Sequence, residues 1–425
     1  MSTLESAFHN YGLIVSIYVT MLILCALIFR RRYLVVLAII NFRGIGGLAA
    51  ILAIPLISPF QIDYLSLFTA IFIEVFCAAV FMLAGIRIIK FLRSSAKVIS
   101  DQKMILLLLA KTVFFMLNYV AADGQYGIFS DDSRIDFLRI SPILSRTMYL
   151  DMIIDFTVLL SVGLRCLSAK RIRWRDFGIL LALISLNYLT GSKGATFMNI
   201  FFVVLFLYSA LPHAFSFVSK TRAIRILCSF AIIFFVYTYQ LSIEHQVSIW
   251  EQIGLLYYRF LMSADARIMS FDPNITNYVL LQPHSNLLAE LFRGPARILG
   301  ASVAEFPIGV YQFQAELNTT NYVGATNQLS AMFVIYDDWG GRLISFVVIA
   351  SVVGLAFLLF STMLNSRNSG VAWVSVAALY YLSTTMCLGF DAFVQMLPIS
   401  VIIVLLFWTL RQLVGDAWST PRGSS

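Results

Sequence analysis

The chain has 425 residues, of which 60% are hydrophobic and only 12% charged, and its mean hydropathy is +0.86. A soluble domain carries roughly 25% charged residues, so this composition excludes an ordinary soluble protein and predicts an integral membrane protein. The net charge of +8 would favour nucleic acid as the partner of a soluble protein, but in a membrane protein basic residues in short loops set the topology. We therefore expect no nucleic-acid partner.

Apolar runs of about 20 residues recur along the chain, a length typical of membrane-spanning helices rather than of barrel strands. They predict an all-α, polytopic fold with about eleven spans, ten and twelve being the alternatives. The spans are expected at residues 11–29, 33–59, 64–89, 104–122, 148–166, 177–191, 195–211, 223–241, 343–364, 371–388 and 390–410. The first run ends in three arginines (30–32) rather than at a small-residue cleavage site, so we expect no cleavable signal peptide.

The basic residues predict how the spans are oriented. With the N-terminus outside, 19 of the 30 lysines and arginines fall in cytoplasmic segments and nine in outer segments, and the short loops alternate as the positive-inside rule requires. A twelfth span or an inside N-terminus is the alternative, because residues 306–310 and 329–336 are also apolar. Both stretches are too short to cross a membrane unaided and are typical of amphipathic or re-entrant helices.

One long polar segment, Ser242–Arg342, interrupts the apolar sequence. Its 101 residues contain five arginines and no lysine, nine acidic residues and two of the four histidines. A solvated surface normally mixes arginine and lysine, so we interpret this composition as a sign of function. We expect three parts: a bundle of about eight helices (1–241), a large external loop with amphipathic helices (242–342), and the last transmembrane helices with a short cytoplasmic tail (343–425).

Two arginines of the loop are predicted to share a helix face. The apolar spacing over residues 251–270 predicts a helix on which Arg259 and Arg267 project in nearly one direction, with Asp265 beside them. Two guanidinium groups on one stripe suit bidentate binding of a phosphate or pyrophosphate. The alternative is a solvated helix face with ion pairs to Asp265 or Glu251.

A second basic group follows His284. If residues 286–299 form a helix, then Glu290, Arg293 and Arg297 share a face, which predicts a basic site with a carboxylate available as a base. Helix capping and ion pairing explain the same pattern equally well. A single histidine without a partner is more often structural than catalytic.

The turn that contains Lys193 lies between two apolar runs near the expected outer face. Its flanking glycines allow the backbone to approach a ligand, and a helix starting at Gly194 would present free N–H groups to an anion. A tight turn with a snorkelling lysine is the alternative. Asp337 and Asp338 invite a metal hypothesis, but neighbouring residues on a helix point about 100° apart and no third ligand is obvious. We expect no metal site.

Ionisable residues also occur inside apolar runs. A charged side chain there costs free energy, so we treat each such residue as a candidate functional residue. Arg43 and Lys111 are the two basic examples, and Asp151 and Asp155, one turn apart, are predicted partners for either. Asn187 is a milder case of the same kind.

This layout resembles the bacterial O-antigen polymerases and other oligosaccharide-repeat-unit polymerases. The resemblance rests on about eleven spans, one large loop in the second half, the Gly-Ser-basic-Gly motif at 191–194, and the aromatic-Gly-Gly ending at 339–341. Family members commonly have arginine where this chain has Lys193. The related O-antigen ligases have a histidine for which residues 325–341 offer no counterpart, and this favours a polymerase.

The resemblance implies a membrane glycosyltransferase of GT-C-like architecture in the bacterial inner membrane, with a periplasmic loop and a metal-independent reaction without a cofactor. Its partners would be undecaprenyl-pyrophosphate-linked oligosaccharide, membrane lipids and a chain-length regulator. The implied catalytic residues are Lys193, Arg259 and Arg267, on the donor pyrophosphate, and Glu290 or Asp265 as base. The implied substrate-binding residues are Arg293, Arg297, His284, Arg134, Arg139, Tyr258 and Trp339.

Four alternatives stay open: an O-antigen ligase, another lipid-linked-sugar glycosyltransferase, a transporter of lipid-linked glycans, and a membrane scaffold without chemistry, which would leave the arginine-only loop unexplained. The transporter is favoured only by Arg43 and Lys111, the basic residues inside apolar runs.

Overall fold

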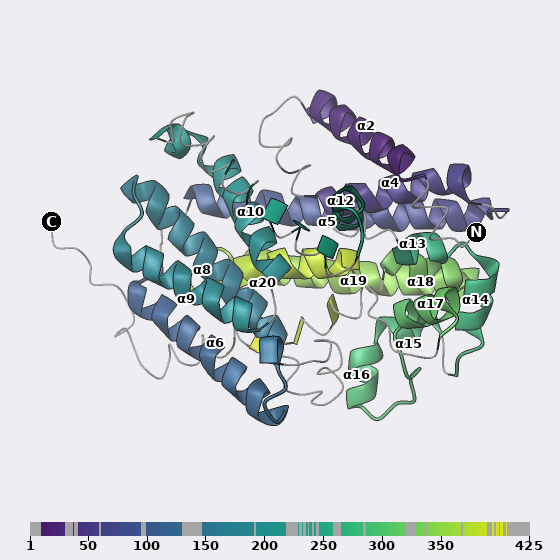
Figure 1. Ribbon diagram of the computed structural model, residues 1–425. Coiled ribbons are helices and arrows are strands. Elements are labelled where there is room, and N and C mark those ends of the chain that lie inside the picture. Colours follow the sequence, from purple (N-terminus) through teal and green to yellow (C-terminus); the bar gives the residue numbers. More distant parts are fainter. Residues whose placement is uncertain are drawn as a thin grey trace. The chain divides into compact units, whose positions relative to one another are not determined.

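The structure is a computed structural model in which the regular elements of the described residues are all helices (Figure 1). It describes residues 10–29, 41–58, 61–94, 99–129, 147–190, 193–217, 246–257, 265–283, 286–319, 328–336, 338–366 and 369–388, and the scattered positions 37, 228, 232, 235–236, 238–239, 242–243, 393–394, 397–398, 400–402 and 405.

Four of the described helices are long and apolar enough to cross a membrane. They are α5 (Tyr64–Ser94), α6 (Asp101–Ala121), the segment Leu150–Ala169 of α8 (Thr147–Ala169), and α19 (Trp339–Met363). Shorter apolar helices are found within α2 (Tyr11–Phe29), α4 (Phe42–Ile57) and α10 (Lys193–Ala210). Together with the composition, these helices make the chain a membrane-embedded helical protein.

Most of the predicted spans coincide with a helix. Besides those already named, α9 (Trp174–Leu189) and α20 (Ser369–Leu388) occupy predicted spans, while α4 begins at Phe42 within the span expected from residue 33. Most residues of the spans expected at 223–241 and 390–410 lie outside the described part. The total of eleven therefore stays a prediction.

The chain divides into two compact units that interleave along the sequence. The first unit comprises Met1–Leu83, Leu211–Val348 and Thr384–Ala392, and the second comprises Ala84–Ala210, Ile349–Ser383 and Phe393–Ser425. The helices α5 and α19 each contribute to both. The long polar segment thus folds together with the N-terminal helices.

In the first unit, the long polar segment forms short helices around α18 (Leu329–Ile335), whose seven residues are all buried. Helix α13 (Asp265–Met269) packs against α4, α17 (Ile308–Leu317) and α18, and α14 (Pro273–Leu280) packs against α17. Figure 1 shows α13, α14, α17 and α18 gathered near α4, and α2 packs against α4 as well. The polar segment is therefore a folded layer rather than an extended loop.

The helices expected in this segment are shorter than predicted. The helix over residues 251–270 is described only at its two ends, as α12 (Ile249–Tyr257) and α13, because residues 258–264 lie outside the described part. The continuous helix expected over 286–299 is divided into α15 (Leu287–Leu291) and α16 (Arg293–Ile298). The break falls at Phe292, whose backbone (φ −108°, ψ 20°) leaves helical geometry.

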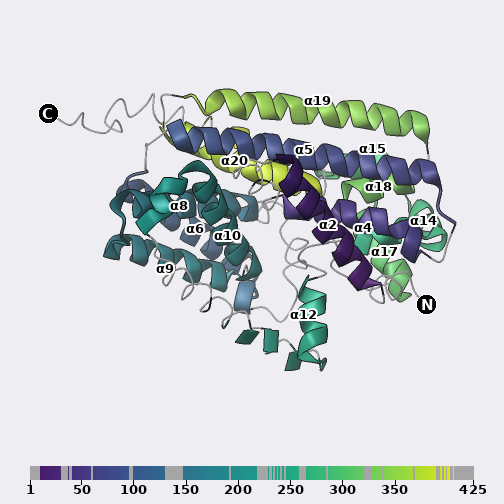
Figure 2. The ribbon, with the colours of Figure 1, turned by 90° about the horizontal axis from the view of Figure 1, so that it is seen from above.

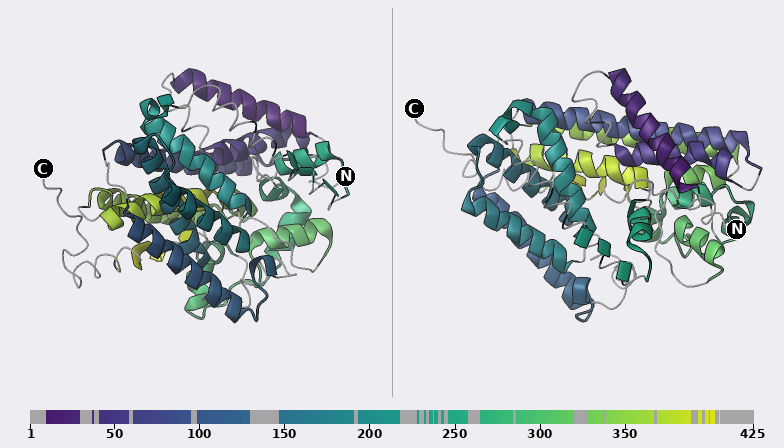
Figure 3. Two further views of the ribbon diagram at one scale, coloured as in Figure 1. Left: turned by 60° about the vertical axis from the view of Figure 1, so that its left-hand side comes forward. Right: turned by 45° about the horizontal axis from the view of Figure 1, so that its top comes forward.

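In the second unit, α8 is the central helix and packs against α6, α9 and α10. Figure 3 shows these blue and teal helices side by side in both views. The core between α8, α10 and α20 is aromatic: Phe156 stacks on Tyr380 with ring centroids 4.0 Å apart, and Phe206 meets both rings edge-on. Such pairs add about 0.5–1.5 kcal/mol each beyond the area they bury.

Candidate functional site

A buried ion pair joins the polar segment to a membrane-spanning helix in the first unit. Arg267 on α13 donates from Nε to Oε1 of Glu74 on α5 (2.6 Å) and from Nη2 to Oε2 (3.2 Å). The Ser330 hydroxyl on α18 donates to the same Glu74 Oε1 at 2.6 Å. The two charged side chains are only 2% and 3% exposed. We call Glu74, Arg267 and Ser330 the Glu74 cluster.

Two buried glutamines flank this cluster. Gln312 on α17 donates from Nε2 to the Ala266 carbonyl (2.9 Å), which ties α17 to α13. Its Oε1, and both polar side-chain atoms of Gln328 at the start of α18, are buried and have no hydrogen-bond partner among the described residues. An unpaired buried polar group is destabilising and therefore rare, which makes these amide atoms candidates for a hydrogen bond to a ligand.

A groove of about 260 Å³ lies between α14 and α17 in the same unit. Asn274, Tyr278, Gln314, Asn318 and Thr319 supply its polar lining, and no charged side chain lines it among the described residues. Side-chain amides and hydroxyls both donate and accept hydrogen bonds, and a tyrosine ring offers an apolar face. The groove therefore suits an uncharged polyhydroxylated ligand such as a sugar.

Two arginines of the polar segment, Arg293 and Arg342, hold its backbone in place. Arg293 donates from Nη2 to the carbonyls of Ala304 and Glu305, both at 2.6 Å, and its Nη1 lies 3.4 Å from Glu290 Oε1. Arg342 donates to two further backbone carbonyls in the same manner. Several donors fixed in one plane allow arginine, but not lysine, to make such contacts together. The contacts of Arg267, Arg293 and Arg342 thus give a structural reason why these positions are arginine and not lysine.

The structure describes only part of the predicted site. The residues that lie outside the described part are Arg134, Arg139, Tyr258, Arg259 and His284. Lys193, Asp265 and Arg297 lie in α10, α13 and α16, where the backbone is described but their side chains are not. Trp339 begins α19 and is half exposed.

Among the predicted residues with described side chains, Glu290 and Arg293 form a pair. Arg267 is turned inward to Glu74 rather than presented on an open helix face.

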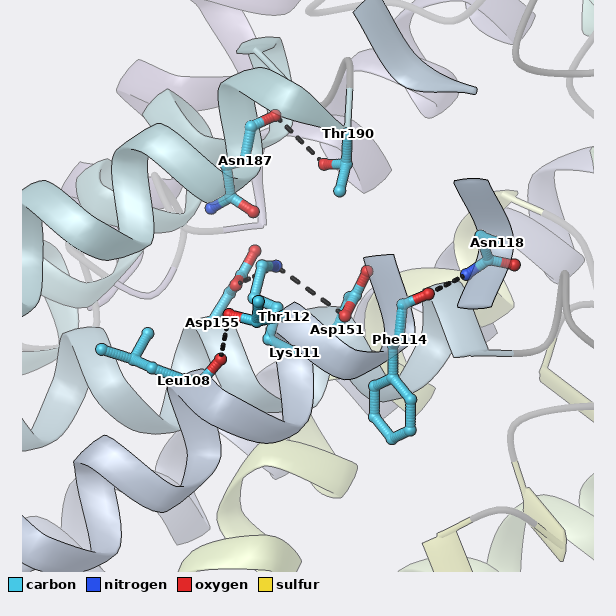
Figure 4. Close-up of polar contacts among 9 residues, drawn as sticks. All are labelled: Leu108, Lys111, Thr112, Phe114, Asn118, Asp151, Asp155, Asn187 and Thr190. Carbon is cyan, nitrogen blue, oxygen red and sulfur yellow. Dashed lines mark hydrogen bonds and ion pairs between the residues drawn. The ribbon is translucent and has the colours of Figure 1, made fainter. Parts of the chain in front are cut away.

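A second buried network lies in the second unit and involves residues predicted inside apolar runs (Figure 4). Lys111 Nζ on α6 is 2.7 Å from Asp155 Oδ1 and 4.0 Å from Asp151 Oδ1, both on α8, which confirms the predicted pairing. Asn187 on α9 is buried in the same region, and its two amide atoms have no hydrogen-bond partner among the described residues. The side chain of Arg43, the other basic residue, is not described.

Glu74 is the functional candidate that the sequence reasoning missed. It is the only acidic residue in the span expected at 64–89, so the cost of placing a charge in an apolar run was the signal that could have found it. Gln312, Gln328 and Ser330 carried no such signal, because uncharged polar residues are common in loops.

No group of three or more histidine, cysteine, aspartate or glutamate side chains that could hold a metal ion occurs in the part of the chain that the structure describes. Comparison with protein-family models, with curated proteins and with solved structures gave no match.

Proposed function

We propose that this protein is a membrane glycosyltransferase that joins lipid-pyrophosphate-linked oligosaccharide repeat units into O-antigen or a related surface polysaccharide. The observation that carries the proposal is the uncharged groove between α14 and α17, whose amide, hydroxyl and tyrosine groups suit a glycan. About eleven spans, a GT-C-like architecture, an inner-membrane location and a periplasmic position of the polar segment are parts of this proposal.

In the proposed reaction the acceptor sugar hydroxyl attacks the anomeric carbon of the donor glycan. A glycosidic bond forms, the bond from that carbon to the lipid pyrophosphate breaks, and the hydroxyl proton passes to a carboxylate, for which Asp265 and Glu290 are the candidates. Cations that stabilise the departing pyrophosphate supply the main electrostatic contribution. We assign this task to Lys193 and Arg259.

The roles of the other arginines follow from their contacts. Arg267 is a positioning residue in this proposal, because Glu74 binds two of its nitrogens and its side chain is 2% exposed. Arg293 likewise holds the backbone at Ala304 and Glu305. Arg297, His284, Arg134, Arg139, Tyr258 and Trp339 remain proposed contacts of the lipid-linked substrates.

The test is a gel of surface polysaccharide from a strain that lacks the gene, complemented by wild type or by variants. Asn274→Ala and Tyr278→Ala should shorten or weaken the polymer ladder because both residues line the groove. Asn277→Ala is the matched control, since Asn277 is exposed on the same helix but does not line the groove. Arg259→Ala should abolish polymer if this arginine stabilises the pyrophosphate.

The deletion strain separates the polymerase from its rivals. Survival of a band that carries a single repeat unit, with loss of the ladder, supports a polymerase. Loss of the single-repeat band as well supports a ligase or a transporter, and an unchanged ladder contradicts a role in that polymer.

A transporter of lipid-linked glycans is the second candidate, and the buried Lys111–Asp155 pair favours it. Both residues lie inside candidate membrane spans, where charged groups often mark a transport pathway. Purified protein reconstituted with lipid-linked repeat units distinguishes the two functions. Longer glycans without movement between leaflets support the polymerase, whereas movement without elongation supports the transporter.

A further inference from the structure

The second unit contains a cavity of about 420 Å³ at the C-terminal ends of α5 and α19 and the N-terminal end of α20. Its volume is in the range of about 300–1,000 Å³ that small-molecule sites occupy. One wall is aromatic, where Phe91 and Trp373 meet edge-on with ring centroids 5.7 Å apart. Figure 2 shows the ends of the three helices lying together.

The cavity is positively charged. Arg87 and Lys90 line it from α5 and, being three residues apart, lie on one face of that helix. Among the described residues no acidic side chain lines the cavity, and neither cation forms an ion pair or hydrogen bond with any of them. Arg93, one turn further on, is different, because it donates to the Ser209 and Ala210 carbonyls at the end of α10. Arg93 is thus structural, whereas Arg87 and Lys90 remain available to a ligand.

Hydrogen-bond donors complete the lining. Ser361 and Ser369 contribute hydroxyls, and the Ser361 Oγ is buried without a hydrogen-bond partner among the described residues. The Ser94 hydroxyl also lines the cavity but donates to the Phe91 carbonyl. Ser369 is the first residue of the 20-residue helix α20, whose dipole favours an anion at that end. Basic residues at the end of α5 are also expected from the positive-inside rule. That rule does not explain the unpaired Ser361 hydroxyl or the aromatic wall.

We propose that this cavity binds a phosphate-bearing anion, supplied either by the headgroup of an anionic membrane lipid or by a free phosphate compound. Arginine, lysine and serine hydroxyls are all donors, which matches a ligand whose oxygens only accept. The proposal does not depend on the glycan chemistry, because the cavity belongs to the second unit and the groove between α14 and α17 to the first.

The test compares two probes on the purified full-length protein in detergent. Phosphatidylglycerol binding is followed by native mass spectrometry and inorganic phosphate binding by calorimetry. The double variant Arg87→Gln/Lys90→Gln should bind the occupying probe about tenfold or more weakly, since each charge-assisted hydrogen bond contributes that order of affinity. The matched control is Lys170→Gln/Arg171→Gln, which removes the same net charge from exposed positions outside the cavity and should bind as wild type does.

The outcomes decide both the proposal and the source of the phosphate. Charge-dependent binding of lipid alone assigns a headgroup site, and comparable binding of inorganic phosphate assigns a free phosphate ligand. Failure of both probes to discriminate wild type from the double variant would overturn the proposal, as would an equal loss in the matched control.

A second variant guards against misfolding of the charge variant. Ser361→Ala should weaken binding several-fold while the unliganded protein keeps its unfolding temperature, because the hydroxyl makes no hydrogen bond within the described structure. Unchanged affinity in Ser361→Ala for both probes would show that the ligand does not enter the cavity.

Discussion

At the residue scale, two buried ion pairs of this apolar chain join separate helices. Glu74 pairs with Arg267, and Lys111 with Asp155, and all four side chains are almost fully buried. Transferring a charge out of water is costly, so an isolated buried charge is strongly destabilising, whereas a pair with additional hydrogen bonds is tolerated. The Ser330 hydroxyl supplies such an additional bond to Glu74.

Removing one partner of the Glu74 cluster should therefore cost more than removing both. We expect Glu74→Leu to lower the free energy of unfolding by about 3–5 kcal/mol, because it leaves the Arg267 guanidinium buried without its carboxylate. The double variant Glu74→Leu/Arg267→Met should be less destabilised than the single variant. Denaturant unfolding in detergent measures both, and a double variant that loses at least as much stability as Glu74→Leu would contradict the prediction.

Asp63 predicts a dependence of stability on pH. Its carboxylate accepts hydrogen bonds from the Ser66 hydroxyl (2.8 Å) and from the Ser66 and Leu65 amides (3.0 and 3.1 Å) at the start of α5. The Ser66 hydroxyl, with the backbone amides and the charge of Arg342, holds the pKa of Asp63 below its ordinary value of 3.8. A carboxylate with a lowered pKa stabilises the folded state above the unfolded pKa, and this stabilisation is lost as the pH falls through the folded pKa.

At neutral pH, Asp63→Ala should therefore unfold at a lower temperature than wild type. The loss of this helix cap should lower the free energy of unfolding by about 1 kcal/mol. The difference should narrow as the pH falls below 3.8. A difference that stays constant across this range would show that the charge of Asp63 does not stabilise α5.

At the element scale, the contact of α4 with α13 depends on a glycine. A Cβ at Gly47 would lie 2.7 Å from atoms of the Arg267 guanidinium, and the pair with Glu74 holds that group in place. We expect Gly47→Ala to reduce stability by about 1–3 kcal/mol, as overpacking does. Gly354→Ala is the control, because nothing lies within 4 Å of its added methyl group, and alanine is favoured over glycine in a helix by about 0.5–1 kcal/mol. Equal unfolding temperatures for the two variants would contradict this account.

Element boundaries could be predicted only where the signal is local. Long apolar runs predicted α5, α6, α8 and α19, since hydropathy needs no knowledge of neighbours. The interruption of the expected helix at Phe292 was missed, although Gly294 and Pro295 follow it closely. Pro295 has no N–H to donate to the Leu291 carbonyl, and its ring crowds that carbonyl. The interruption accompanies the contacts that Arg293 makes with Ala304 and Glu305.

At the scale of the whole molecule, the predicted topology places the polar segment and the turn between α8 and α9 on opposite sides of the membrane. In a cysteine-free background, Leu299→Cys, at a position 85% exposed, should react with an impermeant maleimide on intact cells. Trp174→Cys, at a position 86% exposed, should react only after the membrane is permeabilised. The reverse pattern would show that the N-terminus is inside.

The sequence by itself determined that this is a helical membrane protein and where most of its helices lie, and it named Asp151 and Asp155 as partners for either Lys111 or Arg43. These are properties of short stretches, or of charges so costly in an apolar run that few partners can satisfy them. Only the tertiary structure decided that Arg267 meets Glu74, 193 residues distant, and so is turned away from an open helix face. The uncharged groove between α14 and α17 and the basic cavity were likewise decided there, because each is lined by helices that are separate in the chain and that packing alone brings together.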